Sequence, residues 1–234
     1  KIKELELKNG TSTCTVAANS QVTVDTVMTW TDGDLTLNAG SRFYHPGMTI
    51  ATGEVMTCNN TSKVYCAGTW TFDGTYTANT CETVFRGNST LAGTTAPTFS
   101  KVSVRLGTTV TQNIDISFGG TWYNLGTWTS SSKKVTATAS HNVVGKGSNN
   151  FYDLTISAGT MTLTSLTTAD ASLYVHGTLR IDGVQACGGP NGVTVDGKKY
   201  LVDPQLKHYD FEQYPQDYNN AFIFVIEDNG CGFD

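Results

Sequence analysis

The chain has 234 residues and a net charge of −5, and 15% of its residues are charged, against roughly 25% in typical soluble domains. An acidic chain without a basic stripe is a poor partner for nucleic acid, and no apolar run approaches the roughly 20 residues that cross a bilayer. Aromatic residues at 10% argue against disorder. Thr is the commonest residue, with 38 copies, and it favours strands, so we expect an all-β protein.

Runs with the composition and alternation of strands recur along the chain, separated by turn residues. They cover residues 2–7, 21–30, 34–38, 69–77, 98–106, 109–118, 134–139, 151–157, 161–166, 173–181 and 221–227. No segment predicts a helix, because the candidate 213–220 contains Pro215 and few apolar positions. We expect a single strand-rich scaffold over 1–182, then an irregular cap or loop over 183–234 that returns to a C-terminal strand.

The pairing of these strands is open to two interpretations. Asn-Gly and Asp-Gly dipeptides favour hairpins, and thus an antiparallel sandwich; there are seven, beginning at Asn9, Asp32, Asp73, Asp182, Asn191, Asp196 and Asn229. A quasi-repeat favours stacked parallel strands instead, since Asp34-Leu-Thr-Leu-Asn-Ala-Gly-Ser is echoed by Asp153-Leu-Thr-Ile-Ser-Ala-Gly-Thr. Within 151–182, one parity holds the apolar positions that would face a core: Leu173, Val175, Leu179 and Ile181.

The segment that begins Phe151-Tyr-Asp-Leu-Thr-Ile-Ser-Ala-Gly-Thr resembles the rungs of β-solenoid surface proteins, the class of adhesins and autotransporter passengers. The resemblance is clear over 133–182 and fainter over 15–55. It implies stacked parallel rungs and an extracellular role, and it carries over no catalytic residue. We therefore predict a parallel β-solenoid with an irregular C-terminal cap. The alternative is an antiparallel, jelly-roll-like β-sandwich that assembles by strand donation.

Cysteine usage and the first residue indicate a secreted chain. Six cysteines in a Thr-rich, charge-poor chain fit an oxidising compartment, and none forms a CxxC or zinc-ligand pattern, so we predict no metal and no cofactor. We expect one bridge between Cys187 and Cys231 and two among Cys14, Cys58, Cys66 and Cys81, and six buried free thiols are the alternative. Lys1 fits a chain whose signal peptide has been removed, which predicts an extracellular or cell-surface location.

Both ends carry strands that could mediate self-assembly. A terminal strand that completes a neighbouring subunit's sheet would use Ile2, Leu5 and Leu7, or Phe222, Phe224 and Ile226. Pairing within the chain is the alternative, and a solenoid could also stack through its end rungs. Either route would make the chain a subunit of a homopolymer.

Aromatic residues and sequons suggest contacts with sugars. Trp122 and Trp128 lie six residues apart, so in one straight strand they would share a face and could stack on a polysaccharide; core packing is the alternative. Sequons for N-glycosylation occur at Asn9, Asn59, Asn60 and Asn88.

Catalytic signals are weak. The sequence lacks the common nucleophile, metalloprotease and phosphate-loop motifs. A polysaccharide-cleaving carboxylate pair could come from Asp153, Asp170 and Asp182, and hard oxygen ligands for calcium from residues 31–34, although turn roles explain both sets. We predict a non-enzymatic extracellular structural protein, a subunit of a surface filament, sheath or adhesive fibre. A carbohydrate-binding module or adhesin tip and a β-helical polysaccharide-cleaving enzyme are the alternatives.

Overall fold

The computed structural model describes residues 1–130, 132–145 and 147–158, together with five strands beyond them. The described chain is all-β, without a helix. Its N-terminal strands are β1 (Ile2–Val16), β2 (Gln21–Leu37), β3 (Arg42–His45), β4 (Met48–Ile50), β5 (Val55–Cys58), β6 (Lys63–Phe72), β7 (Thr75–Thr77), β8 (Glu82–Gly93) and β9 (Thr98–Phe99).

The central strands are β10 (Lys101–Val104), β11 (Thr109–Gln112), β12 (Ile116–Phe118), β13 (Trp122–Asn124), β14 (Thr127–Ser130), β15 (Lys134–Ala137), β16 (His141–Val144), β17 (Ser148–Phe151) and β18 (Asp153–Ile156). The last described strands are β19 (Met161–Thr164), β20 (Ser172–Val175), β21 (Leu179–Ile181), β22 (Gly192–Val195) and β23 (Lys198–Leu201).

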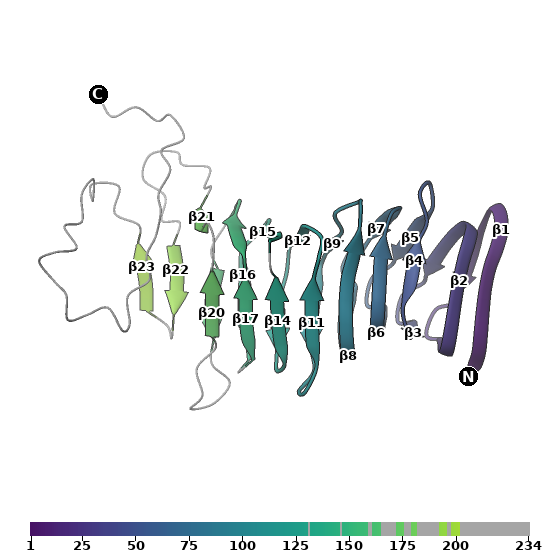
Figure 1. The fold of residues 1–234 in the computed structure, drawn as a ribbon, viewed down its shortest axis with the longest axis horizontal. Helices are drawn as coiled ribbons and strands as arrows, with labels where there is room; N and C mark the ends of the chain where they lie inside the picture. Colours follow the sequence, from purple (N-terminus) through teal and green to yellow (C-terminus); the bar gives the residue numbers. More distant parts are fainter. Residues whose placement is uncertain are drawn as a thin grey trace, which may run out of the picture.

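The strands form a parallel β-solenoid of about 7 turns. From β10 to β19 each strand pairs in parallel with the strand three places later, as β10 does with β13, β11 with β14 and β12 with β15. Three strands therefore complete one turn, and successive turns stack along the long axis of the molecule (Figure 1). The parallel solenoid predicted from the sequence is confirmed.

Each turn presents three faces. The first face contains β3, the starts of β6 and β8, then β10, β13, β16, β19 and β22. The second contains β4, the ends of β6 and β8, then β11, β14, β17 and β20. The third contains the end of β2, then β5, β7, β9, β12, β15, β18 and β21.

The length of a turn varies slightly, which hides the repeat in the sequence. On the first face Arg42 pairs with Lys63, Lys63 with Glu82 and Glu82 with Lys101, so successive turns take 21, 19 and 19 residues. A short corner recurs before this face, in which Ser20, Ser41 and Ser62 each donate their backbone N–H to the carbonyl three residues earlier. Gly40 lies in such a corner at φ 74°, a conformation that suits glycine.

The interior is filled by a continuous series of aromatic rings. In most short strands every second residue is buried, and this pattern recurs from turn to turn. Neighbouring ring centroids lie between 4.4 Å and 6.4 Å apart along this series. It consists of Phe43, His45, Trp70, Phe72, Tyr76, Phe99, Phe85, Trp128, Trp122, Phe118 and Phe151.

The alternative of an antiparallel sandwich is wrong. All the described strand pairs are parallel apart from β22 with β23, which Asp196-Gly197 separates in the sequence. Asn9-Gly10 lies within β1 and Asp32-Gly33 within β2, where both glycines have positive φ. Such dipeptides favour a bend in the chain, and a solenoid uses that bend without reversing the strand.

The N-terminal strand pairs within its own chain. β1 lies parallel to β2 over most of its length, and Leu7 is buried while Leu5 is half-buried and Ile2 exposed. This is the pairing within the chain that the sequence left open as the alternative, and assembly through this strand with a neighbouring subunit stays a prediction. The other predicted assembly residues, Phe222, Phe224 and Ile226, lie outside the described residues, as does most of the predicted cap at 183–234.

Candidate ligand-binding face

Charged side chains line the outward side of the first face. Strand register places Arg42, Lys63, Glu82 and Lys101 in one column, one residue from each successive turn. Outward positions alternate with the buried ones, so these side chains reach solvent while the intervening residues fill the core.

A second column, two residues further along each strand, holds Tyr44, Tyr65, Val84, Ser103 and Tyr123. The rings of Tyr44 and Tyr65 stack with centroids 4.1 Å apart and planes 4° from parallel. Burial and the neighbouring phenol of Tyr44 raise the pKa of Tyr65, which keeps this hydroxyl protonated at neutral pH.

A groove forms where this column has short side chains. Val84 and Ser103 occupy two consecutive turns between Tyr65 and Tyr123. Since strands stack about 4.8 Å apart, the two tyrosine positions lie about 14 Å from each other along the axis. The hollow between them has a volume of about 500 Å³, and Lys63, Glu82, Lys101, Arg105, Thr121 and Leu125 also line it.

Two arginines border the tyrosine column on its other side. Arg86 and Arg105 follow directly after the paired residues Phe85 and Val104, so they occupy equivalent places in adjacent turns. The guanidinium carbon of Arg86 lies 5.2 Å from the ring centroid of Tyr44, and that of Arg105 lies 5.9 Å from the ring centroid of Tyr65. These cation–π contacts hold both guanidinium groups beside the column.

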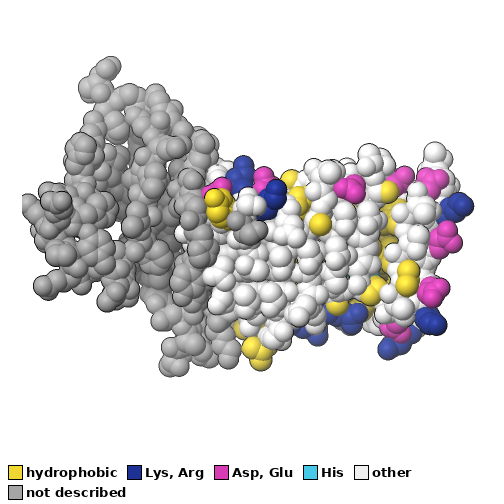
Figure 2. Space-filling model, in the orientation of Figure 1, with side chains coloured by type: hydrophobic (Ala, Val, Ile, Leu, Met, Phe, Trp, Pro, Cys, Tyr) yellow, Lys and Arg dark blue, Asp and Glu magenta, His cyan; other side chains and the backbone are white. Residues whose placement is uncertain are grey.

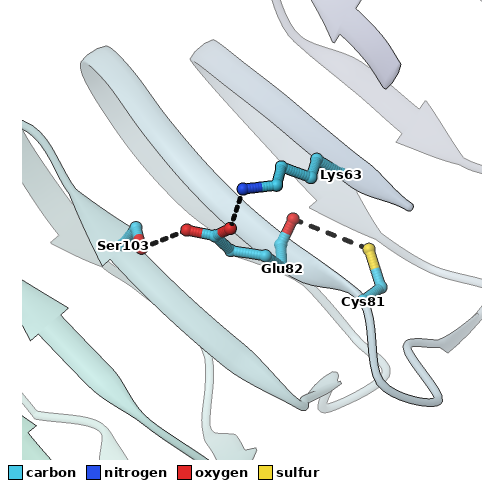
Figure 3. A network of polar contacts seen from close by, with 4 residues as sticks. All are labelled: Lys63, Cys81, Glu82 and Ser103. Atoms are coloured by element: carbon cyan, nitrogen blue, oxygen red, sulfur yellow. Dashed lines mark hydrogen bonds and ion pairs between the residues drawn. The ribbon is translucent and has the colours of Figure 1, made fainter. Parts of the chain in front are cut away.

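One carboxylate, that of Glu82, lies among these cations. Lys63 Nζ lies 2.5 Å from Glu82 Oε2, and Ser103 Oγ donates a hydrogen bond of 2.6 Å to Glu82 Oε1 (Figure 3). Partial burial raises the pKa of Glu82, but the contacts from Lys63 and Ser103 outweigh it and lower the pKa overall. Glu82 is therefore ionised and already has partners for both oxygens.

Three acidic residues outside this face bind the backbone of a neighbouring turn. Each accepts a backbone N–H from the next turn: Asp34, within β2, from Val55, and Asp73 and Asp115, at corners of the solenoid, from Thr94 and Lys134 respectively. Five of the described basic residues lie on the first face, where Glu82 is the one carboxylate beside them. We call this surface the basic tyrosine face, defined by Arg42, Tyr44, Lys63, Tyr65, Glu82, Arg86, Lys101, Ser103, Arg105 and Tyr123.

Elsewhere on the described surface the charges are densest along β1, where Lys3, Glu4, Glu6 and Lys8 mix both signs. Figure 2 shows a body that is mainly white, the colour of the backbone and of side chains that are neither charged nor apolar, with acidic and basic groups at the β1 end and smaller groups beside the grey residues and along the lower edge. A second hollow, of about 380 Å³, lies at a corner near Tyr76, Asn79 and Gly119 and has no charged lining residue. The basic tyrosine face is thus the candidate site with the most binding chemistry.

The prediction that two tryptophans stack on sugars is wrong. Trp122 and Trp128 have no exposed surface, and their ring centroids lie 4.4 Å apart inside the solenoid. The chain bends between β13 and β14, at Gly126, so the two residues belong to different faces rather than to one straight strand. Both rings pack in the core, which was the alternative to sugar stacking.

The predicted disulfides among the first four cysteines are absent. Cys14, Cys58, Cys66 and Cys81 are free thiols, and all except Cys14 are buried in the core. Burial raises the pKa of Cys66 to about 12 and that of Cys58 well above its ordinary value. A hydrogen bond with Cys58 lowers the pKa of Cys81. Cys187 and Cys231 lie outside the described residues.

The remaining candidates are distributed over the solenoid. Asn60 and Asn88 are exposed and Asn9 and Asn59 half-buried, and no finding tests their glycosylation. Asp153 starts β18 on the third face, whereas Asp170 and Asp182 lie outside the described residues, so the proposed carboxylate pair is untested. Residues 31–34 lie within β2, where Asp34 accepts the N–H of Val55.

Sequence reasoning missed the basic tyrosine face. Of its strands, β3, β8 and β13 lay outside the predicted runs, and β6 lay only partly within one. Alternation in Arg42-Phe-Tyr-His and Lys101-Val-Ser-Val was visible, but the register that stacks them was not. Within residues 1–130, 132–145 and 147–158, no cluster of His, Cys, Asp or Glu could hold a metal ion.

Comparison with known proteins adds no relative. No protein-family model, curated protein or solved structure matches the chain. In the part of the chain that the structure describes, no helix has the length and apolarity to cross a membrane. Any functional proposal therefore depends on the geometry of the described surface.

Proposed function

We propose that this chain is an extracellular adhesive β-solenoid that binds an extended polysaccharide along the basic tyrosine face. The observation that carries the proposal is the groove between Tyr65 and Tyr123, with Lys63, Lys101 and Arg105 along its sides. The extracellular location stays a prediction from composition and from the resemblance to surface solenoids.

The groove offers the two kinds of contact that sugars use. The half-buried ring of Tyr123 provides an apolar face on which a sugar ring can stack, and its hydroxyl can form hydrogen bonds, whereas Tyr65 is buried and stacks on Tyr44. Lysine and arginine side chains supply several N–H donors to sugar oxygens. Because parallel strands stack about 4.8 Å apart, the backbone positions that carry these groups are fixed before a ligand arrives.

The arrangement favours binding over cleavage. Hydrolysis of a glycosidic bond uses a pair of carboxyl groups, one of which must be protonated to act as an acid. Among the described residues that line the groove, Glu82 alone carries a carboxyl group, and its lowered pKa keeps it ionised. We therefore prefer an adhesive protein to a polysaccharide-cleaving enzyme.

The test is a glycan array probed with the full chain and with Tyr123→Ala, a variant that removes one wall of the groove. We expect Tyr123→Ala to bind the glycans recognised by the full chain at least tenfold more weakly than the full chain does. Tyr152→Ala is the matched control, because Tyr152 is also partly exposed (38%) but does not line the groove. Equal losses from both variants, or no glycan bound by the full chain, would contradict the proposal.

A filament subunit is the second candidate, favoured by the outer edge of β1. This edge has no pairing partner among the described residues, and Ile2 and Val27 leave apolar surface exposed at the same end. Against it, Lys3, Glu4, Glu6 and Lys8 place charges along β1, a pattern that discourages edge-to-edge pairing. Electron microscopy decides: regular filaments that vanish when residues 1–8 are deleted would establish the subunit, and dispersed particles would exclude it.

A further inference from the structure

We infer that the ligand of the basic tyrosine face is an acidic polysaccharide, whose repeating unit carries a carboxylate or sulfate group. This inference rests on the proposed function, because it names the class of glycan that the same groove selects. The observations behind it are the balance of charge on this face, the availability of its cations and their arrangement around the tyrosine column.

The charge balance on this face is opposite to that of the whole chain. Five cations, on Arg42, Lys63, Arg86, Lys101 and Arg105, stand against the single carboxylate of Glu82, while the chain as a whole carries −5. Five positive charges and one negative charge leave four in excess. A neutral ligand would leave this excess uncompensated, whereas an acidic one neutralises it.

The cations nearest the groove are available to a ligand. Lys101 and Arg105 are exposed, and neither forms an ion pair with another described residue. Lys63 is the exception, since it pairs with Glu82, and this pair accounts for the one acidic group of the face. The carboxylate of Glu82 is thus already paired with Lys63, so an external anion can bind Lys101 and Arg105.

The cations flank the tyrosine column on both sides. Lys63 and Lys101 lie in the column before it, and Arg86 and Arg105 lie after it. A polysaccharide that runs along the axis over Val84 and Ser103 would carry its sugar rings between Tyr65 and Tyr123. Acid groups that project to either side would then meet a lysine on one side and an arginine on the other. Arginine is suited to carboxylate and sulfate groups because its N–H donors match two oxygens at once.

The experiment measures binding of the full chain to polygalacturonate and to the same polymer with its carboxylates methyl-esterified. The two probes share a backbone and differ in charge. We expect at least tenfold tighter binding to polygalacturonate or, for a sulfate-selective site, to chondroitin sulfate over desulfated chondroitin. The preference should weaken as salt rises from 0.05 M to about 0.5 M, because salt screens exposed charges.

Variants assign the preference to this face. Lys101→Gln with Arg105→Gln should abolish the preference for the acidic polymer. The matched control is Lys133→Gln with Lys134→Gln, which removes the same charge next to and within β15 on the third face and should leave binding unchanged. Unchanged tryptophan fluorescence would show that both double variants are folded.

The outcomes separate this inference from the proposed function. Equal binding of charged and uncharged polymers, lost in Tyr123→Ala, would overturn the acidic ligand and leave the glycan site standing. No binding to any glycan would overturn both. Equally tight binding of a single-stranded oligothymidylate would overturn the acidic polysaccharide too, because the face would then recognise polyanions in general.

Discussion

The core of the solenoid differs between residues 41–85 and residues 109–151, although the two regions share a fold. In the first region the polar groups of Ser41, His45 and Trp70 are buried without a hydrogen-bond partner. In the second, Trp122 Nε1 donates to Asn149 Oδ1 at 2.8 Å and Trp128 Nε1 donates to Gln112 Oε1 at 2.9 Å.

The polar groups of the second region form connected networks. Asn149 Oδ1 also accepts from Asn124 Nδ2, and Gln112 Nε2 donates to the carbonyls of Ile114 and Lys134. A buried polar group that lacks a partner costs about 1–3 kcal/mol. Substitutions that break the networks of the second region should therefore lower the free energy of unfolding more than equal substitutions at the unpaired groups of the first. One repeating backbone can therefore hold, side by side, a core with unpaired buried polar groups and a core whose polar groups are hydrogen-bonded.

The largest effect should come from breaking the satisfied network. Asn149→Ala removes the acceptor of two buried donors, on Trp122 and Asn124, and we expect a loss of about 4 kcal/mol in the free energy of unfolding. Urea unfolding followed by tryptophan fluorescence measures it. Asn150→Ala, on the outward side of the same strand, is the control and should change stability by less than about 0.5 kcal/mol. Equal losses would refute the network.

Acid should weaken the first region. Burial, and then the charge of Arg86, lower the pKa of His45 to about 3, with a smaller opposing effect from the backbone of Gly47. Unfolded histidine has a pKa of about 6.5, so below that pH the unfolded chain takes up a proton that the folded chain excludes. Stability is therefore full above pH 6.5 and falls as pH drops toward 3, by about 2 kcal/mol at pH 5.

Unfolding at pH 7 and pH 5 tests this expectation with His45→Phe as the comparison. The variant keeps an aromatic ring in place and removes the titrating group, so its stability should lose this part of the pH dependence. A variant whose stability still falls by the same amount between pH 7 and pH 5 would show that His45 is not the cause.

A smaller difference should separate two equal substitutions. Trp70→Phe and Trp128→Phe remove the same atoms from buried rings, but the first indole N–H has no partner and the second donates to Gln112. We expect Trp128→Phe to cost about 1–2 kcal/mol more, because Gln112 Oε1 would stay buried without its donor. Matched thermal melts of the two variants measure the difference, and identical melting temperatures would contradict it.

The reactivity of the thiols compares the edge of the solenoid with its core without a measurement of stability. In a Cys187→Ala, Cys231→Ala variant, one thiol should react rapidly in the native state, that of half-buried Cys14. Cys58, Cys66 and Cys81 should react only on unfolding, because they are fully buried. Titration with an aromatic disulfide reagent counts them. Fewer than four thiols in the unfolded, unreduced chain would mean that a disulfide forms after all.

Local patterns in the sequence reveal the β class and the existence of rungs. Abundant Thr indicates strands. Period-two alternation then determines which residues of a strand point inward, as Leu154 and Ile156 do. The repeat shared by Asp34–Gly40 and Asp153–Gly159 comes from the end of β2 and from β18 with the residues that follow it. These features are local, so they survive without knowledge of the fold.

Tertiary structure alone decides which rungs meet. Turns of 21, 19 and 19 residues bring Arg42, Lys63, Glu82 and Lys101 into one column, although no stretch of the sequence is basic. A bend between Trp122 and Trp128 turns both rings inward, where a straight strand would have left them on one surface. Side-chain direction follows from the nearest neighbours in the chain, whereas stacking register depends on corner lengths summed over whole turns. The sequence therefore determines the rung, and only the folded solenoid determines the basic tyrosine face.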